Sequence, residues 1–156
     1  MTKDDFDAFW PIFEAIKSTG TSYIYPDSMT KKKAFDYWFF ETHFPFVALD
    51  SGRIVGGYFM RPNLMGRGSH IANASFMVGS NFRGEGYGYA LGLSALEEAK
   101  KLGFKGMQFN NVVSVNHVAV NLWKKLGFSI IGTVPKGYDH KELGFVDTYI
   151  MFRALV

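Results

Sequence analysis

The sequence predicts a mixed α/β fold in which antiparallel strands are followed by a β-α-β-α-β-β unit, with helices on both faces of one sheet. Two amphipathic segments open the chain, and two short apolar runs joined by the turn Asp50-Ser51-Gly52 form a β-hairpin. After residue 70, apolar runs typical of strands alternate with segments of helical spacing. The chain has 156 residues, of which 47% are hydrophobic. One domain with a buried core, residues 1–156, is therefore expected.

Two helices are expected at the start of the chain, over residues 4–18 and 30–40. Asp4 and Asp5 suit the beginning of the first helix, and Gly20 lies just past its end. Pro11 falls inside the helical pattern and allows either a kink or a later start. The apolar residues that recur at helical spacing in this first segment are Phe6, Phe9, Trp10, Phe13 and Ile16.

Six strands and two further helices are predicted along the rest of the chain. Gly103 ends the first of these helices and Gly127 ends the second. The connection between the last two strands, residues 135–144, is expected to be a loop. The expected strands are 45–49, 53–60, 71–78, 106–115, 129–134 and 146–152, the expected helices are 86–102 and 116–126, and a glycine-containing loop is expected at 65–69.

The stretch from Ser75 to Gly88 combines the end of a strand, a glycine-rich turn and the start of a helix. Such a turn presents several backbone N–H groups to an anion, and its glycines let a phosphate approach the backbone. A P-loop is excluded because Tyr89-Ala90 stands where that motif needs Lys-Ser/Thr. A dinucleotide fingerprint is excluded because Gly88 comes one position too early. Helix packing is the alternative role for these glycines.

Two sequence motifs, one after the other along the chain, carry a resemblance to a known family. Arg83, Gly86 and Gly88 match the pattern Arg/Gln-x-x-Gly-x-Gly/Ala. One β-α-β unit later, residues 116–128 are similar to Asn-x-x-Ala-x-x-Leu-Tyr-x-x-x-Gly-Phe, with a tryptophan in place of the tyrosine. Together the motifs resemble the GCN5-related N-acetyltransferases. The resemblance covers about residues 53–155 and implies an acyl-CoA N-acyltransferase fold, although the strand that usually precedes the family's first helix has no counterpart here.

The resemblance implies direct transfer of an acetyl group from acetyl-CoA, as co-substrate, to an amine. Backbone N–H groups at the helix start would bind the CoA pyrophosphate, and the open strand edge would pair with the pantetheine amides. In the family, a bulge separates this strand from the next and leaves its edge free. A strand N–H near Met77 or Val78 would polarise the thioester carbonyl. The expected cofactor-binding residues are Phe76, Met77, Val78, Arg83, Gly84, Gly86, Tyr87, Gly88, Asn116 and Trp123.

Two departures from the family pattern leave the catalytic groups open. Relatives often carry a carboxylate base on the strand before the glycine turn, whereas residues 71–78 hold no acid. Relatives often protonate the leaving thiolate with a tyrosine, whereas Trp123 offers only an indole N–H and is expected to pack. His70 has the chemistry of a base but stands before the strand. Asparagine amides orient water or fix a substrate carboxylate or amine, and a helix cap or strand-bulge contacts are their alternative roles. The expected catalytic-site residues are Asn73, Asn110 and Asn116.

A closer likeness lies in the segments Pro62-Asn63, Gly66-Arg67, Ser69-His70, Asn73-Ala74, Phe109-Asn110 and Ile131-Gly132-Thr133-Val134-Pro135. These segments are similar to yeast N-acetyltransferases that detoxify proline analogues such as azetidine-2-carboxylate. Phosphinothricin-type acetyltransferases resemble the C-terminal part less closely. The likeness implies a small amino-acid-like amine as acceptor. A non-catalytic acyl-CoA-binding module and a protein or peptide N-acetyltransferase are the alternatives.

Composition excludes several classes of protein. Without cysteine the chain has neither disulfides nor a thiol nucleophile, and four scattered histidines give no ligand spacing, so no metal is expected. The formal charge is only +3, and the sequence lacks the concentrated basic face that nucleic-acid binding needs. The N-terminal residues lack the apolar core of a signal peptide, and no apolar run has membrane length. A cytoplasmic protein that acts on a small molecule is expected, and the family resemblance allows a homodimer.

Overall fold

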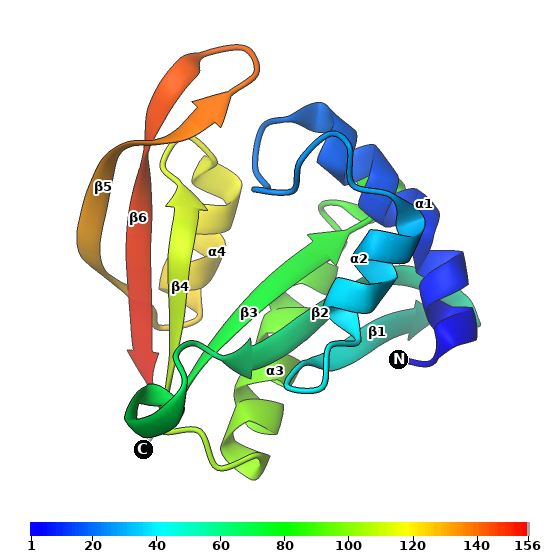
Figure 1. Ribbon diagram of the computed structural model, residues 1–156, viewed down its shortest axis with the longest axis horizontal. Coiled ribbons are helices and arrows are strands. Elements are labelled where there is room, and N and C mark those ends of the chain that lie inside the picture. Colours follow the sequence, from blue (N-terminus) through cyan, green and yellow to red (C-terminus); the bar gives the residue numbers. More distant parts are fainter. Residues whose placement is uncertain (156) are drawn as a thin grey trace.

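The computed structural model describes residues 1–155, which form one six-stranded mixed sheet flanked by helices (Figure 1). The strand order is β1-β2-β3-β4-β6-β5, and within these residues β3 and β4 form the single parallel pair. The predicted fold class is confirmed. The elements are α1 (Lys3–Thr19), α2 (Lys31–Trp38), β1 (Phe44–Asp50), β2 (Arg53–Pro62), β3 (Ile71–Val78), α3 (Tyr87–Lys101), β4 (Gly106–Val113), α4 (His117–Lys125), β5 (Ser129–His140) and β6 (Gly144–Ala154), with short 3₁₀ turns at Gly66–Gly68 and Ser80–Phe82.

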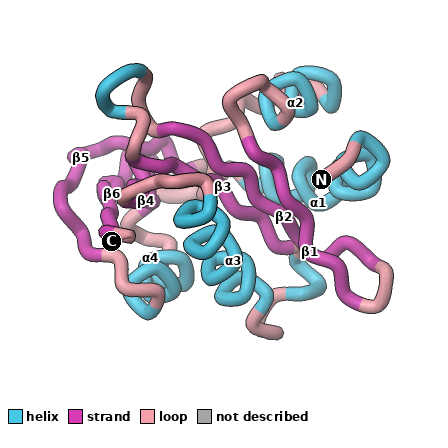
Figure 2. Tube along the Cα trace, turned by 90° about the horizontal axis from the view of Figure 1, so that it is seen from below, coloured by secondary structure: helices cyan, strands magenta, loops and turns pink. Residues whose placement is uncertain are grey.

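The helices divide between the two faces of the sheet: α1 and α2 cover one face, and α3 and α4 cover the other (Figure 2). The cluster beneath α1 and α2 is aromatic, with Phe9 of α1 packed at 4.9 Å, between ring centroids, from Trp38 of α2. Trp38 in turn packs against Phe59 of β2. The second cluster joins α3 and α4 to the opposite face of β2, β3 and β4. Two separate apolar cores therefore pack against the opposite faces of the sheet.

The first helix begins with a capping box. The Thr2 hydroxyl accepts a hydrogen bond from the Asp5 N–H, and the Asp5 carboxylate accepts one from the Thr2 N–H at 2.6 Å. The helix starts before Pro11 and continues through it, and it ends at Gly20, whose φ of 63° is left-handed. These caps fix where the chain leaves α1 and enters the loop that later lines the site.

The parallel strands β3 and β4 pair only at their beginning. Within the described residues their register contains just two pairs, Ile71 with Gly106 and Ala72 with Met107. At the next position, the Asn73 side chain donates a hydrogen bond of 2.8 Å to the Gln108 carbonyl and takes the place of a ladder bond. Beyond this point the strands diverge (Figure 1). The divergence leaves the later part of the β3 edge unpaired.

Residues 135–144 were expected to form a loop, and this expectation is wrong. Strand β5 runs on to His140, and its pairing with β6 resumes from Tyr138 with Val146 to His140 with Gly144. A register shift between Val134 and Tyr138 takes the intervening proline out of the ladder, so its missing N–H breaks no strand pairing.

The lengthened hairpin reaches the loop between α1 and α2, as Figure 1 shows. The Lys141 N–H donates to the Gly20 carbonyl at 3.1 Å, and the Tyr138 hydroxyl donates to the Tyr23 carbonyl at 3.2 Å. These two bonds join segments more than 100 residues apart in sequence. The hairpin therefore holds the α1–α2 loop in place beside the diverging strands. None of the helices in residues 1–155 combines the length and apolar character needed to cross a membrane.

Candidate active site

A cleft of about 790 Å³ opens where the N-terminal ends of α3 and α4 meet the loop between α1 and α2. Arg83 and His140 bring basic groups to its wall, and no aspartate or glutamate lines it. An anion therefore meets no fixed negative charge in the cleft. Nine of the ten expected cofactor-binding residues line it, namely Phe76, Val78, Arg83, Gly84, Gly86, Tyr87, Gly88, Asn116 and Trp123.

The glycine turn presents free backbone donors to this cleft. Gly84 and Gly86 have φ values of 84° and 86°, a conformation that residues with a Cβ rarely adopt. A Cβ placed on either glycine meets no atom within 4 Å, so the space before the turn is open. Gly86 caps α3 without a side-chain hydrogen bond, and the N–H groups of the first helical turn have no partner within the helix. The turn fits a phosphate group.

Gly88 has a different role from the other two glycines. A Cβ at Gly88 would lie 3.3 Å from Cδ2 of Leu122, so this glycine permits the close approach of α3 and α4. One turn later, a Cβ on Gly92 would collide with the Leu126 side chain. The packing role considered from the sequence thus holds for Gly88, while Gly84 and Gly86 are required by their backbone conformation.

Alternate residues of β3 point their backbone N–H and C=O groups toward the cleft. The Gly79 N–H donates to the Val55 carbonyl at 2.9 Å, and Met77 stands opposite Gly57 in β2. Because backbone groups alternate in direction along a strand, Met77 points its N–H and C=O toward β2, whereas Phe76 and Val78 point theirs into the gap. The side chain of Met77 is buried beneath α1. The structure therefore places Met77 away from the cleft and leaves Phe76 and Val78 at its edge.

A second cavity of about 210 Å³ adjoins the first. Its wall comes from β2, β3, β4, the α1–α2 loop, α2 and α4, and aromatic and amide side chains are prominent in it. The two cavities share the side chains at the gap between β3 and β4, so a molecule in one lies next to a molecule in the other. The shared residues are Ser22, Tyr23, Phe76, Asn116, Ala119 and Trp123.

The three asparagines expected at the site all line the smaller cavity. Asn73 bridges β3 to β4, as described above. The Asn110 amide donates to Oδ1 of Asn63 at 2.7 Å and accepts from Nε2 of Gln108 at 2.9 Å, in the segment where the β4–β6 register shifts. Oδ1 of Asn116 accepts from the Ala119 N–H at 3.2 Å and caps α4. The structure thus places all three together; Asn73 and Asn116 also bind the local backbone, whereas Asn110 binds two side chains.

Phe76, Trp123 and Phe109 form an aromatic wall beside the gap. The Trp123 ring lies 4.9 Å from the Phe76 ring and 4.6 Å from the Phe109 ring, and its side chain is buried. The Tyr23 hydroxyl closes the opposite side by donating a hydrogen bond to the Phe76 carbonyl. Burial raises the pKa of Tyr23 well above its ordinary value, so its phenol keeps its proton at neutral pH.

The family model described as acetyltransferase (GNAT) family matches residues 6–128. The chain belongs to this family. A GCN5-related N-acetyltransferase from Kribbella flavida is 39% identical, with a TM-score of 0.94 over 99% of this chain and 94% of that one. At 39% identity, the likeness supports membership of the same family as well as the same fold.

Two further comparisons bear on this GNAT chain. The N-acetyltransferase aca1 of Schizosaccharomyces pombe is 35% identical over 102 residues, or 62% of this chain and 47% of that protein, so the chain spans about half of its length. A GNAT phosphinothricin acetyltransferase from Sinorhizobium meliloti, solved in complex with acetyl-CoA, is 19% identical, with a TM-score of 0.87 over 99% of this chain and 85% of that one. The latter likeness supports the fold.

Some residues that line the GNAT site could not be predicted from the sequence, and one candidate base, His70, lies outside the site. His70 is exposed, lies 3.1 Å through Nδ1 from the Arg67 carbonyl oxygen, and lines neither cavity. Tyr23 and His140 line the cleft but stand in segments without a motif. Nδ1 of His140 accepts from the N–H groups of Glu142 and Leu143, so a neutral His140 carries its proton on Nε2. Residues 1–155 contain no cluster of three or more side chains suited to a metal ion.

Proposed function

We propose that this chain transfers an acetyl group from acetyl-CoA directly to the amine of a small amino-acid-like acceptor. The observation that carries the proposal is the pair of adjoining cavities, which share residues at the gap between β3 and β4. The larger cavity has the anion-binding turn and the open strand edge, and the smaller has an aromatic and amide lining. A donor and an acceptor bound in this way would meet at the shared wall.

Each part of the larger cavity has a role in binding the donor. Acetyl-CoA supplies the acetyl group as an activated thioester. The N–H groups that follow Gly86 would hold its pyrophosphate at the positive end of α3, and Arg83 would add a charge-assisted bond. The N–H groups of Phe76 and Val78 would pair with amide oxygens or polarise the thioester carbonyl.

Among residues 1–155, no carboxylate lies in the site where it could deprotonate the acceptor. Neither cavity is lined by aspartate or glutamate. The amine must therefore arrive neutral or release its proton to water, and the rate would come from holding the two reactants side by side. Tyr23 is the phenol among the shared residues, and we assign it to stabilise the leaving thiolate by donating a hydrogen bond, while the proton that the thiolate finally takes up is the one released by the acceptor amine.

The size and lining of the smaller cavity favour a small acceptor. Its volume of about 210 Å³ lies below the range of roughly 300–1,000 Å³ that is typical of pockets for drug-sized ligands. Asn63 and Asn110, which belong to the segments similar to the proline-analogue enzymes, are hydrogen-bonded to each other. The small volume of the cavity supports a small amine over a peptide or protein.

A non-catalytic acyl-CoA-binding module is the second candidate, favoured because no aspartate or glutamate of the described residues lines either cavity. The release of free thiol from acetyl-CoA distinguishes the two functions. We expect release to depend on the acceptor when the protein is given a panel of amino acids and their analogues. Saturable acetyl-CoA binding with no acceptor-dependent thiol release would establish the module instead.

Asn110→Ala is expected to lower kcat/KM for the amine roughly tenfold, because it removes an amide that makes two hydrogen bonds at the acceptor cavity. The KM for acetyl-CoA should not change, since Asn110 does not line the larger cleft. Steady-state kinetics with each substrate varied in turn measures both values. Asn121→Ala, at an exposed position of α4 outside both cavities, is the matched control. An Asn110→Ala variant as active as the parent would remove this residue from the site.

A further inference from the structure

Arg61 on β2 is a cation without a charged partner in the acceptor cavity. Its Nη1 donates to the Pro62 carbonyl at 3.1 Å, while its Nε is buried and has no hydrogen-bond partner in the described part of the chain. The ion pairs found in residues 1–155 join lysines to acidic residues elsewhere and leave Arg61 out. A buried donor without an acceptor is costly, and the described residues leave much of the hydrogen-bonding capacity of this guanidinium unused.

Arg61 is the single charged side chain that lines this cavity. The remaining lining side chains are aromatic, aliphatic, amide or hydroxyl groups. The Arg61 charge is not neutralised by a neighbouring group. Burial is the main cause that lowers the pKa of His43, and the Arg61 charge lowers it further. Burial raises the pKa of Tyr25, and the Arg61 charge partly opposes this rise. The cavity therefore carries net positive charge, which attracts an anionic group and disfavours a polycation.

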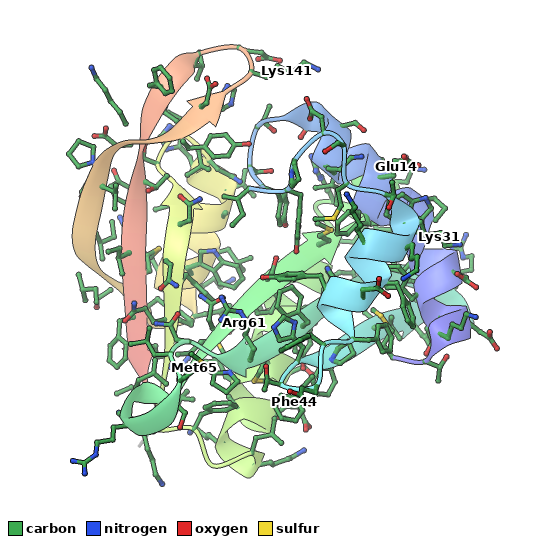
Figure 3. All side chains as sticks on the ribbon, viewed as in Figure 1. Glu14, Lys31, Phe44, Arg61, Met65 and Lys141 are labelled. Carbon is green, nitrogen blue, oxygen red and sulfur yellow. The ribbon has the colours of Figure 1, made fainter. Side chains whose placement is uncertain are left out.

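The strand register places Arg61 beside the predicted acceptor residues. Arg61 stands opposite Asn73 in the β2–β3 pair, and Asn73 in turn bridges to β4. Figure 3 shows Arg61 over the sheet, between β4 and α2. Phe59, two positions earlier on the same face of β2, lines the cavity as well. Arg61 thus projects from the α1–α2 face of the sheet with Phe59, whereas Phe76, Phe109 and Trp123 belong to the core on the other face.

We propose that Arg61 binds a carboxylate of the acceptor, so that the acceptor is a free amino acid or a close analogue rather than a neutral amine. A guanidinium presents paired N–H groups that match the two oxygens of a carboxylate, which explains why an arginine suits this position. The inference rests on the proposed acetyltransferase function, and it assigns the acceptor class and the residue that selects it.

The test compares carboxylates with their carboxamides. The twenty standard amino acids and azetidine-2-carboxylate, each beside its carboxamide, are offered with saturating acetyl-CoA, and thiol release gives kcat and KM. For the parent protein we expect carboxylates to have the higher kcat/KM. Arg61→Met should raise the KM of the preferred amino acid roughly 10- to 100-fold, as expected for loss of a charge-assisted hydrogen bond. The kinetics with its carboxamide should not change, and Arg61→Lys should recover part of the loss.

Two controls separate this inference from the function on which it rests. Arg67→Met removes an exposed arginine outside both cavities and should behave as the parent. Acetyl-CoA binding, followed by calorimetry, should be the same in all variants. If the parent acetylates carboxamides as well as carboxylates, or if Arg61→Met lowers both equally, the role of Arg61 is overturned while the acetyltransferase function stands. If acetyl-CoA does not bind, or no acceptor is acetylated, both proposals fail.

Discussion

Gly86→Glu is expected to weaken acetyl-CoA binding by about 100-fold or more while the protein stays folded. The new carboxylate would stand at the N-cap of α3, where the free N–H groups are proposed to hold a phosphate. Two like charges about 4 Å apart repel by about 4 kcal/mol in a partly exposed site, enough for a loss of this size. A negative charge at a helix N-terminus stabilises the helix, which offsets part of the strain of a side chain at φ 86°.

Gly103→Glu is the matched control for this variant. Gly103 also has a left-handed φ, 86°, and a Cβ placed there meets no atom within 4 Å, but it lies just past the other end of α3 and lines neither cavity. It should therefore suffer the same backbone strain without losing acetyl-CoA. Calorimetric titration measures affinity and thermal unfolding measures stability. Equal affinities of the two variants would show that the glycine turn does not bind the cofactor.

Trp123→Ala is expected to lower the free energy of unfolding by about 3–5 kcal/mol, the usual cost of removing a buried tryptophan side chain. The ring packs between Phe76 of β3, Phe109 of β4 and Phe128 after α4, so its loss would open a hole that joins both cavities. The cost is a large part of the roughly 5–15 kcal/mol that typically stabilises a domain. Denaturant unfolding measures it. Lys124→Ala, an exposed neighbour on α4, should change stability by less than about 0.5 kcal/mol.

Trp123→Phe separates packing from chemistry. A phenyl ring keeps most of the apolar contact but has no N–H, so turnover should stay within about fivefold of the parent if the indole only packs. Trp123 stands where many relatives have tyrosine. A Trp123→Phe variant with normal stability and acetyl-CoA affinity but no turnover would assign a chemical role to the indole N–H and contradict our assignment of the thiolate-stabilising hydrogen bond to Tyr23.

The order of elements could be predicted because local signals set it. Gly103 and Gly127 end the helices as expected, since both have left-handed φ values that glycine favours. The glycine turn was predicted from residues that lie next to one another in sequence. The extension of β5 was missed because Pro135 is typical of a loop, whereas the register shift that accommodates it depends on β6. Tertiary pairing outweighed local preference at that point.

The acceptor half of the site was less predictable for the same reason. Arg61 and Tyr23 stand in segments without a motif, and they meet because the strand register and the hairpin bring them to one cavity. Nothing in the spacing of these residues signals that meeting. Met77 shows a second limit of prediction from sequence. The sequence predicts the strand, but it does not predict which residues of the strand point their backbone groups toward the open edge. The divergence of β3 and β4 decides that.

Backbone amide chemical shifts, followed by NMR during an acetyl-CoA titration, test the central claim most directly. The account predicts saturable shifts concentrated at Phe76, Val78 and residues 83–88, with smaller changes at Met77, whose N–H faces β2. The turn around Gly103, past the other end of α3, should not respond. Saturable shifts located elsewhere, or no shifts at millimolar acetyl-CoA, would contradict the assignment of this cleft to the cofactor.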